Sequence, residues 1–241
     1  MIYRGRIVLL GMNLEGDFVV GYGVSGRSPE SRKRVARFYE EYTSRFFSGR
    51  VEIEILGEPT EEQKKNLQNI QYRAMILKAL KGEGIAAVSN GLQTQDIYDN
   101  FALKGYSSVA SVLSEWGRET DSLGTPRIAG FFVSRGSTYS ASMGFAGKNT
   151  ESEYFTLSKG KGFVVSTYGK NPFEEGKDPV IPENLNEAKE KINIPAKTSQ
   201  DLAEWLFEDD FWAGKGLKVS AVGARFEGYR WSVDIINARE L

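Results

Sequence analysis

The feature that most constrains the fold of this chain is a succession of short apolar runs separated by turns. Residues 6–10 and 18–24 flank a polar turn near the start, and residues 217–226 and 230–236 flank another near the end. Paired runs of this kind indicate β-hairpins. Because helical patterns fall between the groups of strands, two antiparallel sheets covered by helices would bury the apolar faces. The sequence therefore predicts an α+β fold, and since no linker divides the chain, residues 1–241 are expected to form one domain.

Several stretches have the pattern of helices. Apolar and aromatic side chains recur at helical intervals between residues 34 and 47, which predicts an amphipathic helix there. Residues 94–103 and 107–116 predict two consecutive helices. Thr198 and Asp201 have the spacing of a capping box, so another helix is expected to begin there.

Two residue types are absent from the chain, which contains no cysteine and no histidine. Their absence removes disulfides, thiolate nucleophiles, imidazole metal ligands and Ser-His-Asp triads as explanations of function. Proton transfer must then be carried out by Asp, Glu, Tyr or Lys. The carboxylates show no spacing typical of a calcium loop, so we expect neither a metal nor another cofactor.

Charge and hydropathy restrict the partners. The formal net charge is −1, and no apolar run has the length of a membrane span. A nearly neutral chain offers no overall field for nucleic acid or an anionic membrane. Residues 1–5 lead directly into a strand without the pattern of a signal peptide. We therefore expect a cytoplasmic protein that binds neither nucleic acid nor a membrane.

The stretch from residue 86 to residue 96 begins as an apolar strand, breaks at Asn-Gly and continues as a polar helix start. A strand, a glycine turn and a helix start present backbone N–H groups and short polar side chains to ligands, often anionic ones. The alternative is a connecting loop in which Thr94 caps the helix. In the first interpretation one pocket is rimmed by Ser89, Asn90, Gln93, Thr94 and Asp96.

Two other stretches place cations beside strands. Arg27 and Ser28 follow the strand at 18–24 and have the chemistry to hold a phosphate, although a solvated basic loop is an equal alternative. Arg127 follows Pro126 at the start of a strand, where it is suited either to an anion or to a structural ion pair.

Taken together, these stretches resemble the archaeal-type IMP cyclohydrolase family. The resemblance is carried, in this order along the chain, by Tyr3-x-Gly5-Arg6, Tyr22-x-Val24-Ser25-x-Arg27-Ser28, Val88-Ser89-Asn90-Gly91 with Thr94 and Asp96, Thr125-Pro126-Arg127-Ile128-Ala129 and Ser166-Thr167-Tyr168. It implies a four-layer αββα sandwich related to the N-terminal-nucleophile hydrolases, in which two stacked antiparallel sheets are flanked by helices. It also implies ring closure of 5-formamidoimidazole-4-carboxamide ribonucleotide to IMP and water. Separately, we expect a homo-oligomer.

The resemblance also implies roles for individual side chains. Glu119 is favoured for proton transfer and Tyr72 for orienting the substrate, while Asn90 or Arg127 would donate to the formyl oxygen. Arg27, with Ser28 and Arg32, would hold the 5′-phosphate. The complete expectation is a catalytic set of Tyr72, Asn90, Glu119 and Arg127, and a substrate-binding set of Ser25, Arg27, Ser28, Arg32, Ser89, Gly91, Thr94, Asp96 and Thr125.

Two positions depart from the family pattern, because Gly23 and Gly26 stand where the pattern has Arg and Ser. Their presence motivates a second hypothesis, a purine-nucleotide binder that has the pocket but no turnover. A third hypothesis is an amidohydrolase of the same fold with a Ser or Thr nucleophile. It is poorly supported, because no general base lies at a recognisable spacing.

Overall fold

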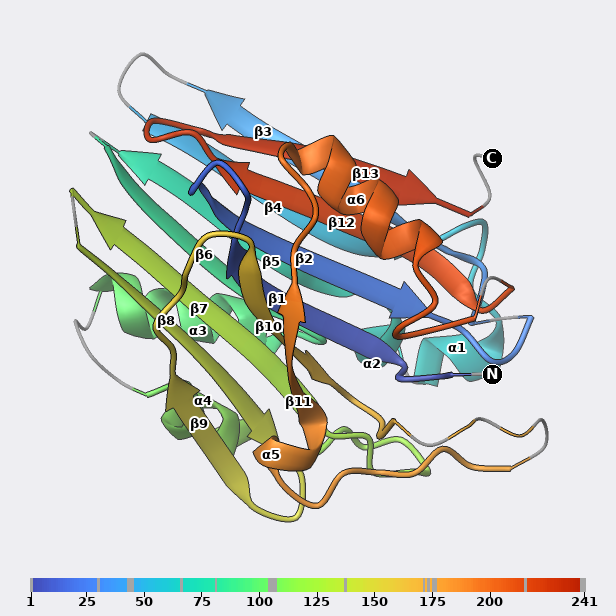
Figure 1. Ribbon diagram of the computed structural model, residues 1–241. Coiled ribbons are helices and arrows are strands. Elements are labelled where there is room, and N and C mark those ends of the chain that lie inside the picture. Colours follow the sequence, from blue (N-terminus) through green and yellow to red (C-terminus); the bar gives the residue numbers. More distant parts are fainter. Residues whose placement is uncertain are drawn as a thin grey trace.

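The computed structural model describes residues 2–29, 31–42, 46–65, 67–80, 82–103, 108–136, 138–170, 172, 174, 177–214 and 216–238. Within these residues the chain forms two antiparallel sheets and a few helices, which is the α+β arrangement that the sequence predicts (Figure 1). None of the described helices combines the length and the apolar character needed to cross a membrane.

One sheet contains strands from both ends of the chain. Its strand order is β11-β10-β1-β2-β12-β13, and every neighbouring pair is antiparallel. The predicted hairpins at both ends of the chain are confirmed, since β1 pairs with β2 and β12 pairs with β13. The strands are β1 (Arg6–Met12), β2 (Phe18–Ser25), β10 (Lys161–Ser166), β11 (Lys189–Asn193), β12 (Lys218–Phe226) and β13 (Trp231–Asn237).

The other sheet is an antiparallel meander in which each strand pairs with the next along the chain. Its seven strands are β3 (Arg34–Tyr42), β4 (Phe46–Ile55), β5 (Tyr72–Leu80), β6 (Glu83–Ser89), β7 (Arg127–Arg135), β8 (Thr138–Ala146) and β9 (Thr150–Tyr154). The connection between β6 and β7 is the long one, and it carries two helices.

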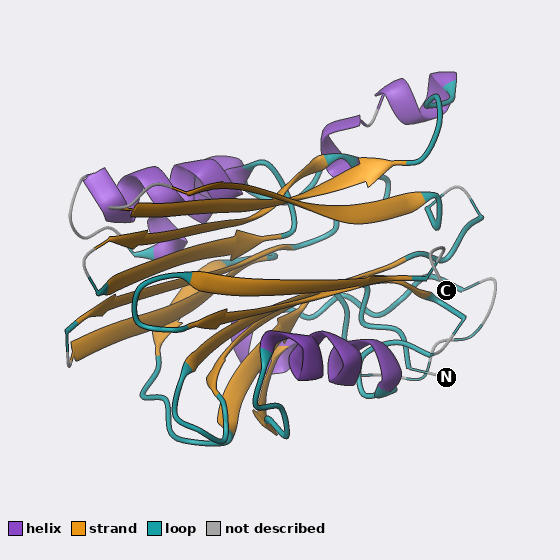
Figure 2. Cartoon of the chain, turned by 90° about the horizontal axis from the view of Figure 1, so that it is seen from above, coloured by secondary structure: helices purple, strands orange, loops and turns teal. Residues whose placement is uncertain are grey.

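The two sheets are stacked face to face, as Figure 2 shows. Buried side chains from both sheets form the main hydrophobic core; Val8 and Tyr22 come from the six-stranded sheet and Met143 comes from the seven-stranded sheet. The rings of Phe132 and Trp231 meet edge-to-face between the sheets, with centroids 6.1 Å apart. This shared core makes the two sheets one packing unit.

Helices cover the outer faces of the sheets. α3 (Gln93–Leu103) and α4 (Val109–Trp116) pack on the seven-stranded sheet through a second apolar cluster, and α6 (Ser199–Glu208) packs on the six-stranded sheet through a third (Figures 1 and 2). The capping box predicted at Thr198 is present at the start of α6. The remaining helices, α1 (Glu61–Lys65), α2 (Leu67–Ile70) and α5 (Leu185–Ala188), are single short turns.

The helix predicted between residues 34 and 47 is wrong, because β3 and the start of β4 occupy this stretch; residues 43–45 lie outside the described residues. The aromatic side chains that recur at helical intervals instead belong to a paired hairpin. The rings of Phe38 and Phe47 stack across it with centroids 6.4 Å apart, whereas Tyr39 and Tyr42 are exposed. Aromatic residues favour strands, so composition was the better guide here than spacing.

The register places the ends of several strands at one end of the sandwich. Arg6 at the start of β1 pairs with Val24 near the end of β2. In the other sheet, Ser89 at the end of β6 pairs with Ala129 near the start of β7. Because hydrogen bonds from Arg6 reach the segment that follows β6, these ends of the two sheets lie together. The loops that leave them form the site described below.

The contact between α6 and β12 can be tested by one substitution. A Cβ atom at Gly223 would lie 2.2 Å from the backbone oxygen of Ser199 and 2.7 Å from the backbone nitrogen of Ala203. Gly223→Ala must therefore displace α6, and we expect the free energy of unfolding in urea to fall by about 1–3 kcal/mol. Gly216→Ala is the control, since no non-neighbouring atom lies within 4 Å of its Cβ position. Equal losses in both variants would contradict this close packing.

Candidate functional site

A polar cavity of about 370 Å³ opens at the end of the sandwich where these strand ends lie together. It lies between the start of β1, the loop after β2, α2 and the loop that precedes β7. Among the described residues its walls are formed by Tyr3, Gly5, Arg6, Ser25, Arg27, Ser28, Ser31, Arg34, Asn69, Ile70, Glu119, Asp121 and Tyr168.

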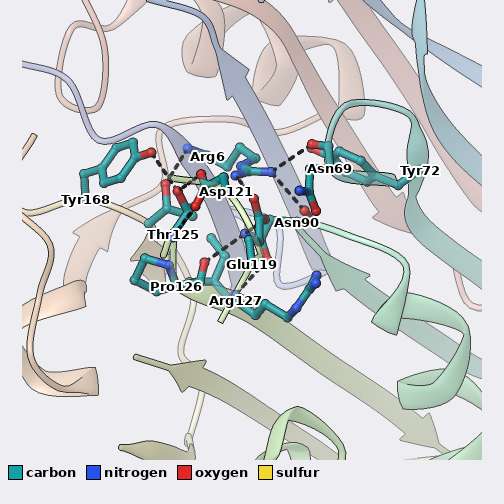
Figure 3. Close-up of polar contacts among 12 residues, drawn as sticks. Arg6, Asn69, Tyr72, Asn90, Glu119, Asp121, Thr125, Pro126, Arg127 and Tyr168 are labelled. Atoms are coloured by element: carbon teal, nitrogen blue, oxygen red, sulfur yellow. Dashed lines mark hydrogen bonds and ion pairs between the residues drawn. The ribbon is translucent and has the colours of Figure 1, made fainter. Parts of the chain in front are cut away.

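A buried ion pair joins the two sides of this cavity. The Nη2 atom of Arg6 lies 2.7 Å from Oε2 of Glu119, and both side chains are almost completely buried. The Nη1 atom of Arg6 donates to the backbone oxygens of Asn90 (3.2 Å) and Asn69 (3.4 Å). Figure 3 shows this guanidinium between the two segments. The pair is therefore a fixed link between β1 and the loops of the other sheet.

Asn90 fixes the other oxygen of the carboxylate. Its Nδ2 atom donates to Oε1 of Glu119 (2.9 Å) and to the backbone oxygen of Pro126 (3.0 Å). Its Oδ1 atom accepts from the backbone N–H of Ile128 and from Nε2 of Gln93. Both amide hydrogens are thus used inside the protein. Asn90 orients Glu119, and its expected donation to a substrate oxygen would require one of these bonds to break.

The protonation equilibrium of Glu119 is shifted by its surroundings. Burial raises the pKa of this carboxyl above its ordinary value of 4.5, although the neighbouring charge of Arg6 and its hydrogen bond act in the opposite direction. A carboxyl whose pKa is raised towards neutrality is suited to general acid–base catalysis. Glu119 is the carboxyl that the sequence predicts for proton transfer, and it lines the cavity.

Cations and hydroxyls gather around another part of the cavity wall. The guanidinium of Arg27 lies over the stacked rings of Tyr3 and Tyr168, 5.9 Å and 6.0 Å from their centroids. Arg34 is buried and donates to the backbone oxygens of Ser25 and Ser31. Charged groups of this kind bind carboxylates and phosphates, so this part of the wall is the candidate anion site.

Glycines shape this wall. The backbone of Gly5 has a φ of 73°, and a Cβ atom there would lie 2.3 Å from Oγ1 of Thr167. Gly26 allows the loop to fold back, because a Cβ atom there would lie 2.6 Å from Oγ of Ser31. Gly23 faces Trp212 and Ile7 on the α6 side of the sheet, away from the cavity. An arginine at position 23 of this chain would therefore meet the apolar layer beneath α6.

Of the thirteen site residues expected from the sequence, four line this cavity: Glu119, Arg27, Ser28 and Ser25. The hydroxyl of Ser25 donates to the backbone oxygen of Gly5 (2.5 Å), so it also holds the first strand against the loop. Arg32 stands outside the described cavity wall, and it donates to the backbone oxygens of Arg27 and Gly216.

Tyr72 lies in the core between the sheets. Its hydroxyl is 2.5 Å from the hydroxyl of Tyr22, and burial raises the pKa of Tyr22. Both phenols are close enough to Arg6 to interact electrostatically with it. Tyr72 is therefore near the buried ion pair without forming part of the described cavity wall.

Arg127 lies on the helix-covered side of its sheet. Its Nη1 atom donates to Oε1 of Gln93 (2.9 Å), and its guanidinium lies 5.2 Å from the ring centroid of Trp116. Burial lowers the pKa of this group, although Glu119 acts in the opposite direction. In Figure 3 its side chain points away from Arg6, so the structure separates Arg127 from the cavity.

The polar residues after β6 form a local network at the start of α3. The hydroxyls of Ser89 and Thr94 are 2.5 Å apart, and both also bond to the backbone oxygen of Gly91. Asp96 accepts from Nε1 of Trp116 (2.8 Å). All four residues stand outside the described cavity wall, as a connecting loop would. Thr94 is the second residue of α3, however, and its hydroxyl donates to the backbone oxygen of Gly91, so the cap that this interpretation expected at Thr94 is not the contact observed.

Thr125 also stands outside the described cavity wall. Its hydroxyl bonds to Oδ2 of Asp121 and lies 3.0 Å from the hydroxyl of Tyr168. It thereby positions two side chains that do line the cavity.

Several cavity residues were not predicted as site residues. Arg6 and Tyr168 lie within the motifs Tyr3-x-Gly5-Arg6 and Ser166-Thr167-Tyr168, so the signal was present in the resemblance. Asn69 has no such signal, because it lies on a four-residue helix between two unremarkable polar stretches. Only the folded chain places it beside Arg6.

An enclosed carboxylate beside a cation-lined wall has the chemistry of a protein that binds a small anionic molecule and exchanges a proton with it. Comparison with known proteins agrees with this class. Residues 3–228 match the model of the family described as IMP cyclohydrolase-like protein. The chain belongs to this family.

Two curated relatives carry the name IMP cyclohydrolase. The protein of Methanothrix thermoacetophila is 33% identical over 177 residues, which cover 72% of this chain and 77% of the relative. The protein of Methanococcus maripaludis is 28% identical over 211 residues, which cover 86% of this chain and 88% of the relative.

The raised pKa of Glu119 predicts a pH dependence of stability. Above pH 4.5, and up to the raised pKa, the folded state retains a proton that the unfolded state has released. The free energy of unfolding of the wild type should therefore fall, relative to that of Glu119→Gln, as the pH rises through this interval. Urea unfolding of both proteins across a pH series measures this difference.

Glu227→Gln provides the control with the opposite sign. Although burial opposes the change, hydrogen bonds from Ser232, Arg230 and Arg225 lower the pKa of Glu227 to about 2. Relative to this variant, the wild type should gain stability as the pH rises from about 2 to 4.5. The same slope for both variants would contradict the raised pKa of Glu119.

Proposed function

We propose that this protein is an IMP cyclohydrolase, which closes the ring of 5-formamidoimidazole-4-carboxamide ribonucleotide to give IMP and water in purine nucleotide biosynthesis. The observation that supports it most is the buried Arg6–Glu119 pair at a cavity whose wall also carries Arg27 and Arg34. The membership of the family and the two relatives named IMP cyclohydrolase agree with it.

The reaction requires positioning and proton transfer. The carboxamide nitrogen of the substrate attacks the formyl carbon of the same molecule, and the carbinolamine that forms loses water. Holding the two groups in contact supplies much of the acceleration, because both belong to one bound molecule. The carboxamide nitrogen loses one proton as the C–N bond forms, and the formamide nitrogen loses another as the ring C=N bond forms. The former formyl oxygen gains both protons and leaves as water.

Glu119 is the proposed site of proton transfer. Each of its oxygens accepts one hydrogen bond from the protein, from Arg6 or from Asn90. A carboxylate oxygen has two lone pairs, so Glu119 can still accept the proton of the attacking nitrogen. The same group, once protonated, can deliver a proton to the oxygen that leaves.

Arg6 and Asn90 support this step. The cation of Arg6 lines the cavity, where it stabilises the negative charge that develops on the formyl oxygen. This role was expected for Asn90 or Arg127, but Asn90 is occupied with Glu119, and Arg127 binds Gln93. We assign Tyr72 an orienting role that acts through the core beside Arg6.

The anion site is proposed to hold the 5′-phosphate of the substrate. Arg27 and Ser28, which the sequence predicts for this purpose, are joined there by Arg34 and Ser31. The family pattern has an arginine where this chain has Gly23, and Arg34 supplies a cation at the cavity wall. Its presence supports turnover over the hypothesis of a binder without turnover.

We also propose the wider relationships that the resemblance implies. The two stacked sheets with helices on both sides suit a relationship to the N-terminal-nucleophile hydrolases. The shared core supports one domain for residues 1–241. A cytoplasmic homo-oligomer that needs no metal or other cofactor remains our expectation.

The activity itself can be tested with purified protein. We expect it to convert the ribonucleotide to IMP, followed by the change in absorbance, with and without EDTA. Glu119→Gln should lower kcat about a hundredfold or more, because proton transfer by a positioned group contributes about 10²–10⁴-fold. Glu115→Gln, on the exposed face of α4, is the control and should retain wild-type kcat.

Three outcomes would change this assignment. Binding of IMP by a wild type that never turns over substrate would favour the binder. Loss of activity in EDTA would overturn the expectation that no metal takes part. Release of ammonia from simple amides would favour an amidohydrolase.

The phosphate assignment predicts a change in KM. Arg27→Gln should raise KM for the ribonucleotide about tenfold to a hundredfold, because a hydrogen bond to a charged group contributes about 1.5–3 kcal/mol. Arg37→Gln is the matched control, since Arg37 pairs with Glu54 at the exposed edge strand β3. An unchanged KM in Arg27→Gln would place the phosphate elsewhere.

A further inference from the structure

Asn69 presents a feature that the mechanism above does not use. It is 7% exposed and lines the cavity, yet neither Oδ1 nor Nδ2 has a hydrogen-bond partner among the described residues. A buried polar atom without a partner lowers the stability of the folded state. Buried polar groups are paired in nearly all native proteins. The unpaired side chain of Asn69 therefore indicates that a bound ligand supplies its partner.

The position of Asn69 shows which part of a ligand it would meet. The guanidinium of Arg6 donates through Nη1 to the backbone oxygen of Asn69 and through Nη2 to Glu119. Asn69 and Glu119 therefore flank the same cation, as Figure 3 shows. The anion site around Arg27 and Arg34 is formed by other segments of the chain. Asn69 thus lies at the reacting end of the cavity.

The chemistry of the side chain defines its partner. A carboxamide has one donor and one acceptor side by side, in either orientation of the amide. Its natural complement is another amide, with which it forms two parallel hydrogen bonds. The substrate offers such a group in its own carboxamide, and IMP offers the same donor–acceptor edge in the C=O and N–H of its newly closed ring.

We propose that Asn69 forms paired hydrogen bonds with the carboxamide of the substrate and with the corresponding C=O and N–H edge of IMP. This inference rests on the proposed function. The N–H beside the carbonyl, which IMP retains, is held by Asn69. The other N–H of the carboxamide points to the formyl group and is the one that loses its proton to Glu119 as the C–N bond forms. Asn69 therefore selects the reactive rotamer of the carboxamide.

The proposal separates recognition of the base from recognition of the sugar phosphate. We would measure binding of IMP and of ribose 5-phosphate to the wild type, Asn69→Leu and Asn69→Asp by calorimetry. Asn69→Leu removes donor and acceptor, and Asn69→Asp removes the donor while keeping the shape. Both should weaken binding of IMP about tenfold or more and change binding of ribose 5-phosphate less than about twofold.

Two variants provide the comparison. Arg27→Gln should weaken binding of both molecules, because both carry the phosphate. Asn186→Leu, at an exposed position, should change neither. Circular dichroism checks that each variant is folded. If Asn69→Leu does not fold, the test is made with Asn69→Asp alone.

The outcomes are distinct from those for the proposed function. Equal losses for IMP and ribose 5-phosphate in the Asn69 variants would mean that Asn69 contacts the sugar or only supports the fold, and would overturn this inference. Unchanged binding of both would also overturn it. In either case turnover by the wild type would leave the proposed function intact, whereas a wild type that neither binds IMP nor turns over substrate would overturn both.

Discussion

The buried ion pair between Arg6 and Glu119 is the interaction on which the site depends. It joins the first strand of one sheet to the loop that enters the other sheet, and the backbone oxygens of Asn69 and Asn90 bind the same guanidinium. Removing one partner of such a pair leaves an unpaired buried charge, at a cost of about 3–5 kcal/mol. The same contact that holds the two sheets together at this end therefore fixes the group proposed to move the proton.

The architecture explains why the site lies at one end of the sandwich. In the middle of the molecule the space between the sheets is filled by apolar side chains. At the end, β1, β2, β6 and β7 begin or terminate together, and their loops carry the polar groups. Glycines allow these loops to approach one another. A Cβ atom at Gly5 would lie only 2.3 Å from Oγ1 of Thr167, so a larger residue has no space there.

The sequence predicted the two sheets and the terminal hairpins, and the resemblance named Glu119, which lines the cavity. It failed between residues 34 and 47, where aromatic spacing produced by a hairpin imitates a helix. It also placed Arg127 and the polar residues after β6 in the pocket, because the order of motifs along the chain does not reveal which face of a sheet each side chain occupies. Asn69 was missed for a different reason, because it lies on a short helix and its contact with Arg6 crosses 63 positions of sequence.

The most direct test of the account is a crystal structure of the protein with IMP. The account predicts the phosphate among Arg27, Ser28 and Arg34, with the closed ring against Glu119 and its C=O and N–H edge paired with Asn69. A nucleotide bound with its phosphate at Glu119, or bound outside the cavity that Arg6 lines, would contradict it.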